Sequence, residues 1–290
     1  MKEKELHNGS VPFLNCKDHL VSGETYEVMM NDKLDMLVTS PTPPNIDEYY
    51  DSKEYQSHNE SKNVLLDKLY KGVKKRSFKT KTSLFHKENA RLTILDVGAG
   101  TGDFLLCCKN LGHETSGTEP MLKPRTKAQE KGVILSENLN SFAGKKFDVI
   151  TLWHVLEHVP NLYEIIDQLK SMLNADGQLF VAVPNFKSYD AAYYKEFWAA
   201  YDVPRHLWHF SQKTIQTLFG AVNLKVVKTH PMKYDSFYVS LLSEKNKKGT
   251  YNYVKAFFVG LRSNMKALKS KEYSSLIYEL KHTKKLSKRK

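Results

Sequence analysis

The sequence has no long apolar run. None of its 290 residues fall in an uninterrupted apolar stretch of the roughly 18 residues needed to cross a bilayer, so no membrane-spanning helix is predicted. Residues 1–5 lack the apolar core of a signal peptide. Cysteine is also scarce: only Cys16, Cys107 and Cys108 are present. We therefore expect a protein of the reducing cytoplasm without a structural disulfide.

Acidic residues are scarce at the C-terminal end, which makes the charge uneven. Residues 245–290 contain 14 Lys and Arg but only two acids, Glu272 and Glu279, and so account for the whole net charge of +12. The rest of the chain has 30 basic and 30 acidic residues. The basic segment is either a solvated end of the chain or a contact with an anionic surface, RNA or lipid.

The most informative stretch is residues 92–105. An apolar run leads into Asp96, Gly98, Gly100 and Gly102 follow at alternate positions, and a helix-like pattern then begins. This order predicts a buried strand, a tight turn and a helix N-terminus that a ligand can approach closely. The dinucleotide fingerprint G-x-G-x-x-G requires a third glycine where this chain has Asp103, so the spacing does not favour a dinucleotide.

The G-x-G-x-G turn after an Asp-ended strand resembles the first motif of class I S-adenosylmethionine (SAM) methyltransferases. The resemblance implies SAM as cofactor, with its aminoacyl part at the turn. Glu119 lies 19 residues after Gly100 and ends a second predicted strand, where a carboxylate can bind both ribose hydroxyls. Adenine is expected near Asn138 and Leu139. The expected cofactor contacts are Asp96, Gly98, Ala99, Gly100, Thr101, Gly102, Glu119, Asn138, Leu139, Trp153 and His154.

From residue 92 onward, short apolar segments alternate with helical patterns, as in a doubly wound sheet. We predict an α/β fold with a Rossmann-like, doubly wound, seven-stranded sheet whose last strand is antiparallel and follows a helical insertion at about 234–271. The predicted strands are 93–97, 114–119, 132–136, 147–153, 177–184, 224–229 and 273–280, with helices at 102–111, 120–131, 162–173 and 211–219.

A second motif spans residues 147–159. It resembles the F-D…E-H-V segment of small-molecule methyltransferases, including the ubiquinone-pathway O-methyltransferases, and the resemblance covers about residues 90–230. His154, Glu157 and His158 also read as the H-x-x-E-H motif of inverted zinc proteases, but that motif belongs on a helix and here follows a buried strand. In ubiquinone-type relatives the loop is Glu-x-x-Glu-His and can carry a divalent ion. Because His154 replaces the first Glu, we expect no metal, with His154, Glu157 and His158 as the alternative ligands.

A third segment, residues 202–211, resembles the D-x-P-R-H-L-x-x-F/Y-S segment of a bacterial subfamily of these enzymes. Loops after strands are where open α/β sheets bind ligands. We name His206 and His158 as candidate catalytic bases, and Arg205, Tyr194 and Trp198 as candidate substrate-binding residues. The alternative is a structural Arg–His pair that bonds loop carbonyls.

The ends of the chain are expected to differ from the centre. Residues 1–60 resemble the zinc-ribbon leader of some bacterial methyltransferases, but the paired C-x-x-C knuckles are missing, so we expect a loosely structured, metal-free vestige. The methyltransferase domain is placed at 61–281, starting with a helix over about 61–88, and a basic tail at 282–290. The insertion is either a lid helix or a basic amphipathic helix on an anionic membrane.

These observations lead to one functional expectation. The chain is predicted to transfer a methyl group from SAM to a small-molecule acceptor, with a quinone-, lipid- or glycan-linked hydroxyl as the preferred target. The alternatives are an RNA methyltransferase that uses the basic C-terminal segment, and a non-catalytic SAM-binding module. No obligate protein partner is expected, and contact with an anionic membrane or RNA would be peripheral.

Overall fold

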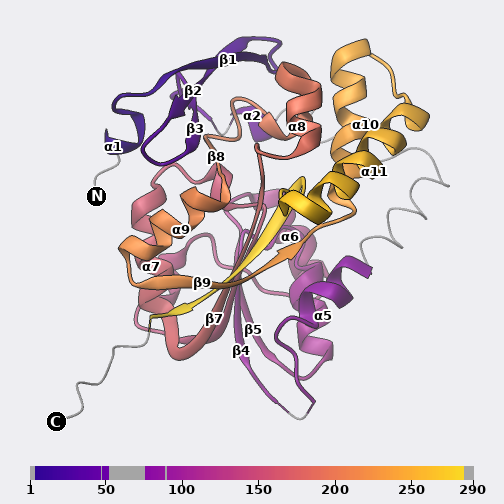
Figure 1. The fold of residues 1–290 in the computed structure, drawn as a ribbon. Helices are drawn as coiled ribbons and strands as arrows, with labels where there is room; N and C mark the ends of the chain where they lie inside the picture. Colours follow the sequence, from indigo (N-terminus) through magenta and orange to yellow (C-terminus); the bar gives the residue numbers. More distant parts are fainter. Residues whose placement is uncertain (1–3, 47, 52–75, 89, 284–290) are drawn as a thin grey trace.

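The computed structural model describes residues 4–46, 48–51, 76–88 and 90–283. Its main feature is a six-stranded sheet in the order β5-β4-β6-β7-β10-β9 (Figure 1). The pairs β5–β4, β4–β6 and β6–β7 are parallel, and β10 is antiparallel to both β7 and β9. The strands are β4 (Thr93–Val97), β5 (Glu114–Thr118), β6 (Phe147–Trp153), β7 (Leu173–Pro184), β9 (Leu224–Pro231) and β10 (Ser275–His282). The predicted α/β class and the antiparallel last strand are confirmed.

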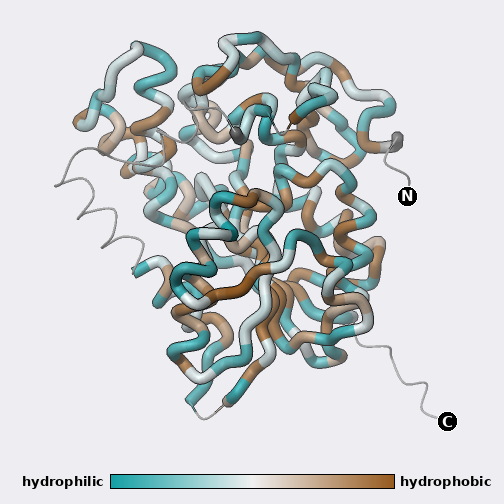
Figure 2. The backbone as a smooth tube through the Cα atoms, turned by 180° about the vertical axis from the view of Figure 1, so that it is seen from behind, coloured by the Kyte–Doolittle hydropathy of each residue, from teal (hydrophilic) through white to brown (hydrophobic). Residues whose placement is uncertain are grey.

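Alternating side chains of the strands bury two faces of this sheet. On β6, Ile150 and Leu152 pack with residues of α7 (Leu162–Met172) and α9 (Gln212–Ala221), whereas Val149 packs with Phe104 of α5 (Asp103–Asn110). Successive residues of a strand point to opposite faces, so a nearly continuous apolar run is what two covered faces require. Figure 2 shows these hydrophobic stretches gathered in the strands at the centre of the molecule.

The sheet has six strands because the strand predicted at 132–136 does not form. In the described chain it is reduced to one parallel bridge between Ser136 and Thr118. Gly132, with φ +76°, ends the turn after α6 (Leu122–Glu130), and Ile134 is 85% exposed. Too few residues remain in line with β5 to form a ladder.

The N-terminal segment is more ordered than the sequence suggested. Strands β1 (Val11–Lys17), β2 (Thr25–Asn31) and β3 (Met36–Ser40) form an antiparallel sheet, and β8 (Trp208–His209) adds a fourth strand beside β3. The expectation of loose structure is therefore wrong. On β2, the buried side chains of Tyr26 and Val28 alternate with exposed neighbours. This short pattern did not predict a sheet, because most of the apolar residues that cover it lie on other segments.

The insertion before β10 is helical, as predicted. It consists of α10 (Asp235–Lys248) and α11 (Tyr253–Ser270). A second apolar core joins Val239 and Val259 of this insertion to the N-terminal sheet and to Tyr194 and Trp198, in and just after α8 (Tyr189–Tyr194). The N-terminal sheet, the β7–α9 connection and the insertion thus form one layer over the carboxyl ends of the main strands (Figure 1).

Two predicted segments lie partly or wholly outside the described residues. The helix expected over 61–88 is seen as helix at 76–82, and its earlier part is not described. Most of the basic tail, 284–290, is also not described. The division of the chain at residues 60 and 281 stays a prediction. Among the described residues, no helix is long and apolar enough to cross a membrane.

Candidate active site

The glycine turn has the backbone conformation that its spacing predicted. Gly98, Gly100 and Gly102 have φ of +67°, +55° and +72°, in the left-handed region that favours glycine. A Cβ on Gly98 would lie 2.6 Å from Cγ2 of Val155, so Gly98 is needed for packing. A Cβ on Gly100 would meet nothing within 4 Å. Gly100 therefore leaves open space beside the half-buried backbone just before α5, where a ligand can approach.

Two buried carboxylates border the turn. Glu119 accepts hydrogen bonds from the backbone N–H of Gly100 (2.9 Å) and of Met121 (3.0 Å). Asp96 accepts a hydrogen bond from the hydroxyl of Thr151 at 2.6 Å. Burial raises the pKa of Asp96 to about 7, although Thr151 and the Lys81 ammonium oppose this shift. Burial also raises the pKa of Glu119. Both groups lie where the sequence placed them relative to the glycines.

Lys81, which sequence reasoning missed, brings a buried cation to the same site. Its Nζ lies 4.3 Å from the centre of the Trp153 ring, and the residue is 9% exposed. Burial lowers the pKa of Lys81 to about 8, against the attraction of Asp96 and Asp235. Lys81 lies in a lysine-rich helical segment where nothing in the sequence distinguished it from its solvated neighbours.

The loop after β6 is fixed by His154. This residue has φ +58°, and its ring contacts Glu157 through Nδ1 and Asp235 through Nε2, each at 3.3 Å. Burial opposes a positive charge on His154, but Asp235 and Glu157 outweigh it and raise the pKa to about 9. The protonated ring thus connects the β6 loop to the first residue of α10. Asp235 was also missed, because only the fold brings it to this loop.

A polar cluster lies next to this loop. Glu157, His158 and His206 each offer one ligand-type atom within 4.8 Å of the others. Nδ1 of His158 lies 3.0 Å from the Arg205 carbonyl oxygen and 2.9 Å from the Tyr50 hydroxyl, and Nδ1 of His206 lies 2.9 Å from the Ala200 carbonyl oxygen. A carbonyl can only accept, so both rings carry hydrogen on Nδ1, and Nε2 is the atom left to accept a proton whenever the ring is neutral.

The electrostatics of the cluster keep the His158 imidazole neutral. Burial, followed by repulsion from His206, lowers the pKa of His158 to about 4. Glu157 is fully buried, yet His154 holds its pKa below the ordinary value. Its Oε2 has no hydrogen-bond partner among the described residues. The cluster therefore places a neutral His158 and the His206 ring around one buried carboxylate.

A family model described as a methyltransferase domain matches residues 71–229, more than half of the chain. The chain belongs to the class I SAM-dependent methyltransferases. The ubiquinone biosynthesis O-methyltransferase of Actinobacillus pleuropneumoniae serotype 7 (strain AP76) is 34% identical over 106 residues, 32% of this chain and 45% of that protein. The enzyme of the same name from Agrobacterium fabrum is 31% identical over 110 residues, 34% of this chain and 44% of its own. The matched part is thus less than half the length of these curated relatives.

The solved structures show the same fold at low identity. Magnesium protoporphyrin IX methyltransferase from Synechocystis PCC 6803, with bound SAH, aligns with a TM-score of 0.53 and 15% identity over 80% of this chain and 96% of that one. The agreement confirms the Rossmann-like methyltransferase fold. It does not extend to a substrate, because at this identity only the fold is shared.

Three residues of this methyltransferase that were expected to bind substrate have other partners in the structure. Arg205 is 1% exposed and donates to the carboxylates of Asp18 and Asp202. Tyr194 donates to Glu244, and Trp198 donates through Nε1 to Asp190. All three are buried and bonded to neighbouring side chains, and their assignment to the substrate stays a prediction. The structural alternative for Arg205 is the one the geometry favours.

The remaining expected contacts are placed as follows. Ala99 donates to the Thr118 carbonyl, and Thr101 bonds Asp103 beside the turn. Asn138 is exposed and caps a short helical turn that starts at the buried Leu139. Trp153 ends β6 and packs edge-on against Phe104 at 5.3 Å between ring centres. Their assignment to the cofactor stays a prediction.

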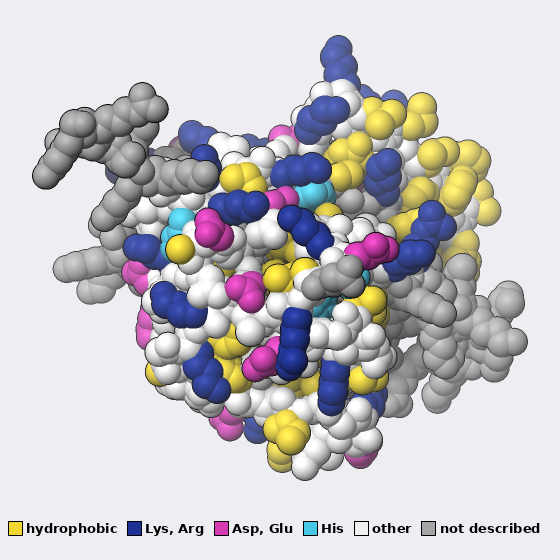
Figure 3. All heavy atoms as spheres, turned by 90° about the horizontal axis from the view of Figure 1, so that it is seen from below, with side chains coloured by type: hydrophobic (Ala, Val, Ile, Leu, Met, Phe, Trp, Pro, Cys, Tyr) yellow, Lys and Arg dark blue, Asp and Glu magenta, His cyan; other side chains and the backbone are white. Residues whose placement is uncertain are grey.

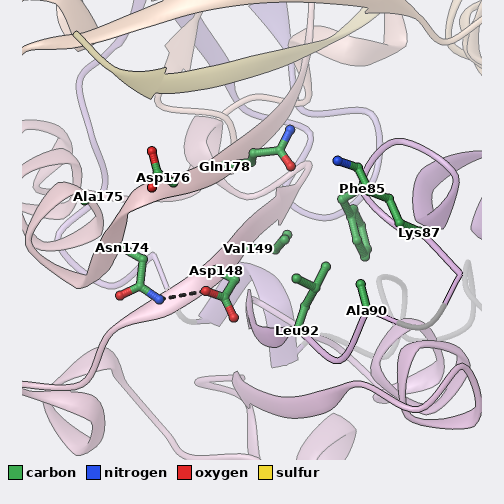
Figure 4. A pocket seen from close by; sticks show the side chains of 10 residues that line it. All are labelled: Phe85, Lys87, Ala90, Leu92, Asp148, Val149, Asn174, Ala175, Asp176 and Gln178. Carbon is green, nitrogen blue, oxygen red and sulfur yellow. Dashed lines mark hydrogen bonds between the residues drawn. The ribbon is translucent and has the colours of Figure 1, made fainter. Parts of the chain in front are cut away.

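A separate pocket lies at the opposite edge of the sheet. It is formed at the amino ends of β4, β6 and β7, whereas the glycine turn and Trp153 lie at the carboxyl ends (Figure 4). Asp148 and Asn174 hydrogen bond to each other across it at 2.8 Å. We do not assign this pocket to methyl transfer. Its lining residues are Phe85, Lys87, Ala90, Leu92, Asp148, Val149, Asn174, Ala175, Asp176 and Gln178.

Proposed function

We propose that this chain transfers a methyl group from SAM to a hydroxyl oxygen of a small-molecule acceptor. The observation that carries the proposal is the open space beside the Gly100 backbone, bordered by Glu119 and Asp96, next to the cluster of His158, His206 and Glu157. The names of the ubiquinone-pathway relatives support an oxygen acceptor. The quinone-, lipid- or glycan-linked hydroxyl remains our preferred class.

The side chains and backbone around the glycine turn have the space and the charges that SAM requires. A Cβ at Gly100 would project into open space, so this backbone leaves room for the aminoacyl chain. Glu119 would hold the ribose hydroxyls once its bonds to Gly100 and Met121 rearrange. Lys81 would pair with the cofactor's carboxylate, and Asp96 with its amino group. The bound cofactor supplies an electrophilic methyl group on a sulfonium.

The chain's own task is to position the acceptor and accept its proton. The acceptor oxygen must lie about 3 Å from the methyl carbon and in line with the departing sulfur. A hydroxyl must also lose its proton, and Nε2 of His158 or His206 can accept it when the ring is neutral, because Nδ1 of each ring faces a carbonyl oxygen. Glu157, buried within 4.8 Å of both rings, stabilises the imidazolium that results.

Labelled SAM tests this proposal directly. The full chain is incubated with SAM carrying a tritiated methyl group and with a small-molecule extract containing phenolic and lipid-linked hydroxyls. We expect labelled product and one equivalent of S-adenosylhomocysteine per methyl group transferred. A His206→Asn variant should bind SAM normally but turn over at least about tenfold more slowly, since one positioned base contributes 10²–10⁴-fold.

The alternatives predict different results. Saturable SAM binding with no labelled product at any pH would identify a non-catalytic binding module. Label in added RNA rather than in small molecules would identify the RNA methyltransferase. We propose that turnover requires no metal, so EDTA should leave the rate unchanged. A rate lost to EDTA and restored by a divalent ion would instead make Glu157, His158 and His206 a metal site.

A further inference from the structure

Helix α11 presents three different faces. Its residues advance by about 100° each around the helix axis. The buried face carries small residues, Ala256, Gly260, Ser263 and Ala267, which allow the helix to lie close against its neighbours. A Cβ on Gly260 would lie 2.8 Å from the Phe237 ring of α10, so this contact is tight. The packing fixes which face of α11 points outward.

The outward face is apolar. At about 100° per residue, its large hydrophobic side chains fall within an arc of about 140°. In this structure Val254 is 68% exposed, Phe258 62%, Met265 61% and Leu268 61%. A helix buries its apolar stripe when it only has to pack on its own domain. The outer stripe consists of Tyr253, Val254, Phe257, Phe258, Leu261, Met265 and Leu268.

Basic side chains run along one border of this stripe. Lys255, Arg262, Lys266 and Lys269 fall between the apolar face and the buried face. Residues 245–271 contain eight Lys and Arg and no Asp or Glu. Figure 3 shows hydrophobic side chains gathered at the edge of the molecule where α10 and α11 lie in Figure 1, with Lys and Arg among them. The surface thus combines apolar area with positive charge.

We propose that the outer face of α11 docks on the surface of a bilayer that contains anionic phospholipid. An interfacial helix buries an apolar face at the boundary of headgroups and acyl chains while its basic residues meet anionic headgroups. The stripe has this composition, with aromatic and aliphatic side chains bordered by Lys and Arg. The docking is peripheral, because no described helix could cross the bilayer.

Charge favours a membrane over the other occupants. A dimer through this face would bring the basic border of each copy to the interface, and residues 245–271 contain no acid to pair with it. RNA would match the lysines but would gain little from Val254, Leu261, Met265 and Leu268. An anionic bilayer matches both the charge and the aliphatic area.

The surface is connected to the candidate active site. α10 packs against α11 and begins at Asp235, which contacts His154 in the β6 loop. A chain docked through α11 would hold its β6 loop near the membrane surface, where a lipid-linked acceptor can be presented. The docking itself does not depend on the proposed methyl transfer and is measured without SAM.

Vesicle flotation tests the proposal with the full chain. The vesicles are phosphatidylcholine alone, or an equal mixture of phosphatidylcholine and phosphatidylglycerol. The double variant Phe258→Gln/Met265→Gln removes apolar contact at exposed positions, and Leu122→Gln/Ile134→Gln is the matched control, at 69% and 85% exposure on another part of the chain. Arg262→Gln/Lys266→Gln removes charge, with Lys109→Gln/Lys123→Gln as its control.

We expect wild type to bind the anionic vesicles at least about tenfold more strongly than the neutral ones. The Phe258/Met265 and Arg262/Lys266 variants should each lose about tenfold, and the loss in the charge variant should shrink in high salt. Both controls should bind like wild type. Equal binding by the Phe258/Met265 variant and wild type would overturn the proposal. An absence of vesicle binding would also overturn it. In that case salt-sensitive RNA binding would favour RNA as the occupant, and a dimer that the Phe258/Met265 variant dissociates would favour a second copy of the chain.

Discussion

At the scale of single residues, Gly100 carries the cofactor assignment. We expect Gly100→Val to weaken SAM binding at least about thirtyfold, because a side chain there would occupy the space that the backbone leaves open and would strain a φ of +55°. Isothermal titration calorimetry with S-adenosylhomocysteine measures this loss. The matched control is Gly112→Val at the other end of α5, which also has a positive φ (+87°) and open space at its Cβ. Equal affinity of the two folded variants would refute the SAM assignment.

Lys81 gives a second test at the same scale. If its ammonium pairs with the cofactor's carboxylate, Lys81→Met should weaken SAM binding about tenfold or more. Lys79→Met is the control, because Lys79 is exposed on the same short helix. The pKa of Lys81 is lowered to about 8, so the cation is present below this pH and lost above it. SAM affinity should therefore fall in wild type as pH rises above about 8, and should stay flat in Lys81→Met.

At the scale of elements, one buried ion pair connects the N-terminal sheet to the loop before β8. Asp18 follows β1, and its Oδ1 accepts a hydrogen bond from Nη2 of Arg205 at 3.0 Å. Asp18→Asn should lower the free energy of unfolding by about 3 kcal/mol, since it leaves Arg205 with one buried carboxylate fewer. Asp32→Asn, in the exposed β2–β3 turn, is the control. Urea denaturation measures both.

The pH dependence of this pair has a definite sign. Burial opposes the Asp18 carboxylate, but Arg205 and the backbone of Ser22 hold its pKa below the ordinary value. The stabilisation is therefore full above the ordinary Asp pKa of about 4 and is lost as pH falls through the lower pKa of the folded protein. The difference between wild type and Asp18→Asn should shrink in acid. A difference that stays constant down to the lowest pH would contradict this role for Asp18.

The same elements show what the sequence could and could not predict. The strand 147–153 and the last strand near 273–280 were predicted within a few residues, because uninterrupted apolar runs bounded by turn residues are local signals. The N-terminal sheet was missed because its core is shared with Trp198, Val239 and Val259, far away in sequence. The contact of Arg205 with Asp18 was missed for the same reason, since the two residues lie 187 positions apart.

The candidate site also contains residues that a local motif predicts and residues that only the fold brings together. The glycine turn, Glu119 and the β6 loop could be read from spacing, because a motif within one βα unit keeps its geometry wherever it occurs. Lys81 and Asp235 could not, because only the packing of a flanking helix and of the insertion brings them to that edge of the sheet. Residues that reach a site from other elements leave no local pattern.

At the scale of the whole molecule, the layer over the carboxyl edge is held to the sheet from several directions. The N-terminal sheet is joined through β8 and Arg205, and the insertion through Asp235 and the second apolar core. The insertion therefore contacts the candidate site directly, where α10 meets the β6 loop. A titratable pair, His154 and Asp235, lies at that contact.

Raising the pH should loosen this contact. The pKa of His154 in the folded chain is raised to about 9, so the stabilisation from its pairing with Asp235 is complete below the ordinary value of about 6.5 and lost as pH rises through about 9. Wild type should have a higher Tm than Asp235→Asn at pH 6, and the difference should disappear by about pH 10. Asp167→Asn, at an exposed position on α7, should show no such trend. In hydrogen exchange, the first turn of α10 should lose protection at high pH in wild type. Protection that is independent of pH would mean that the apolar core alone holds the insertion in place.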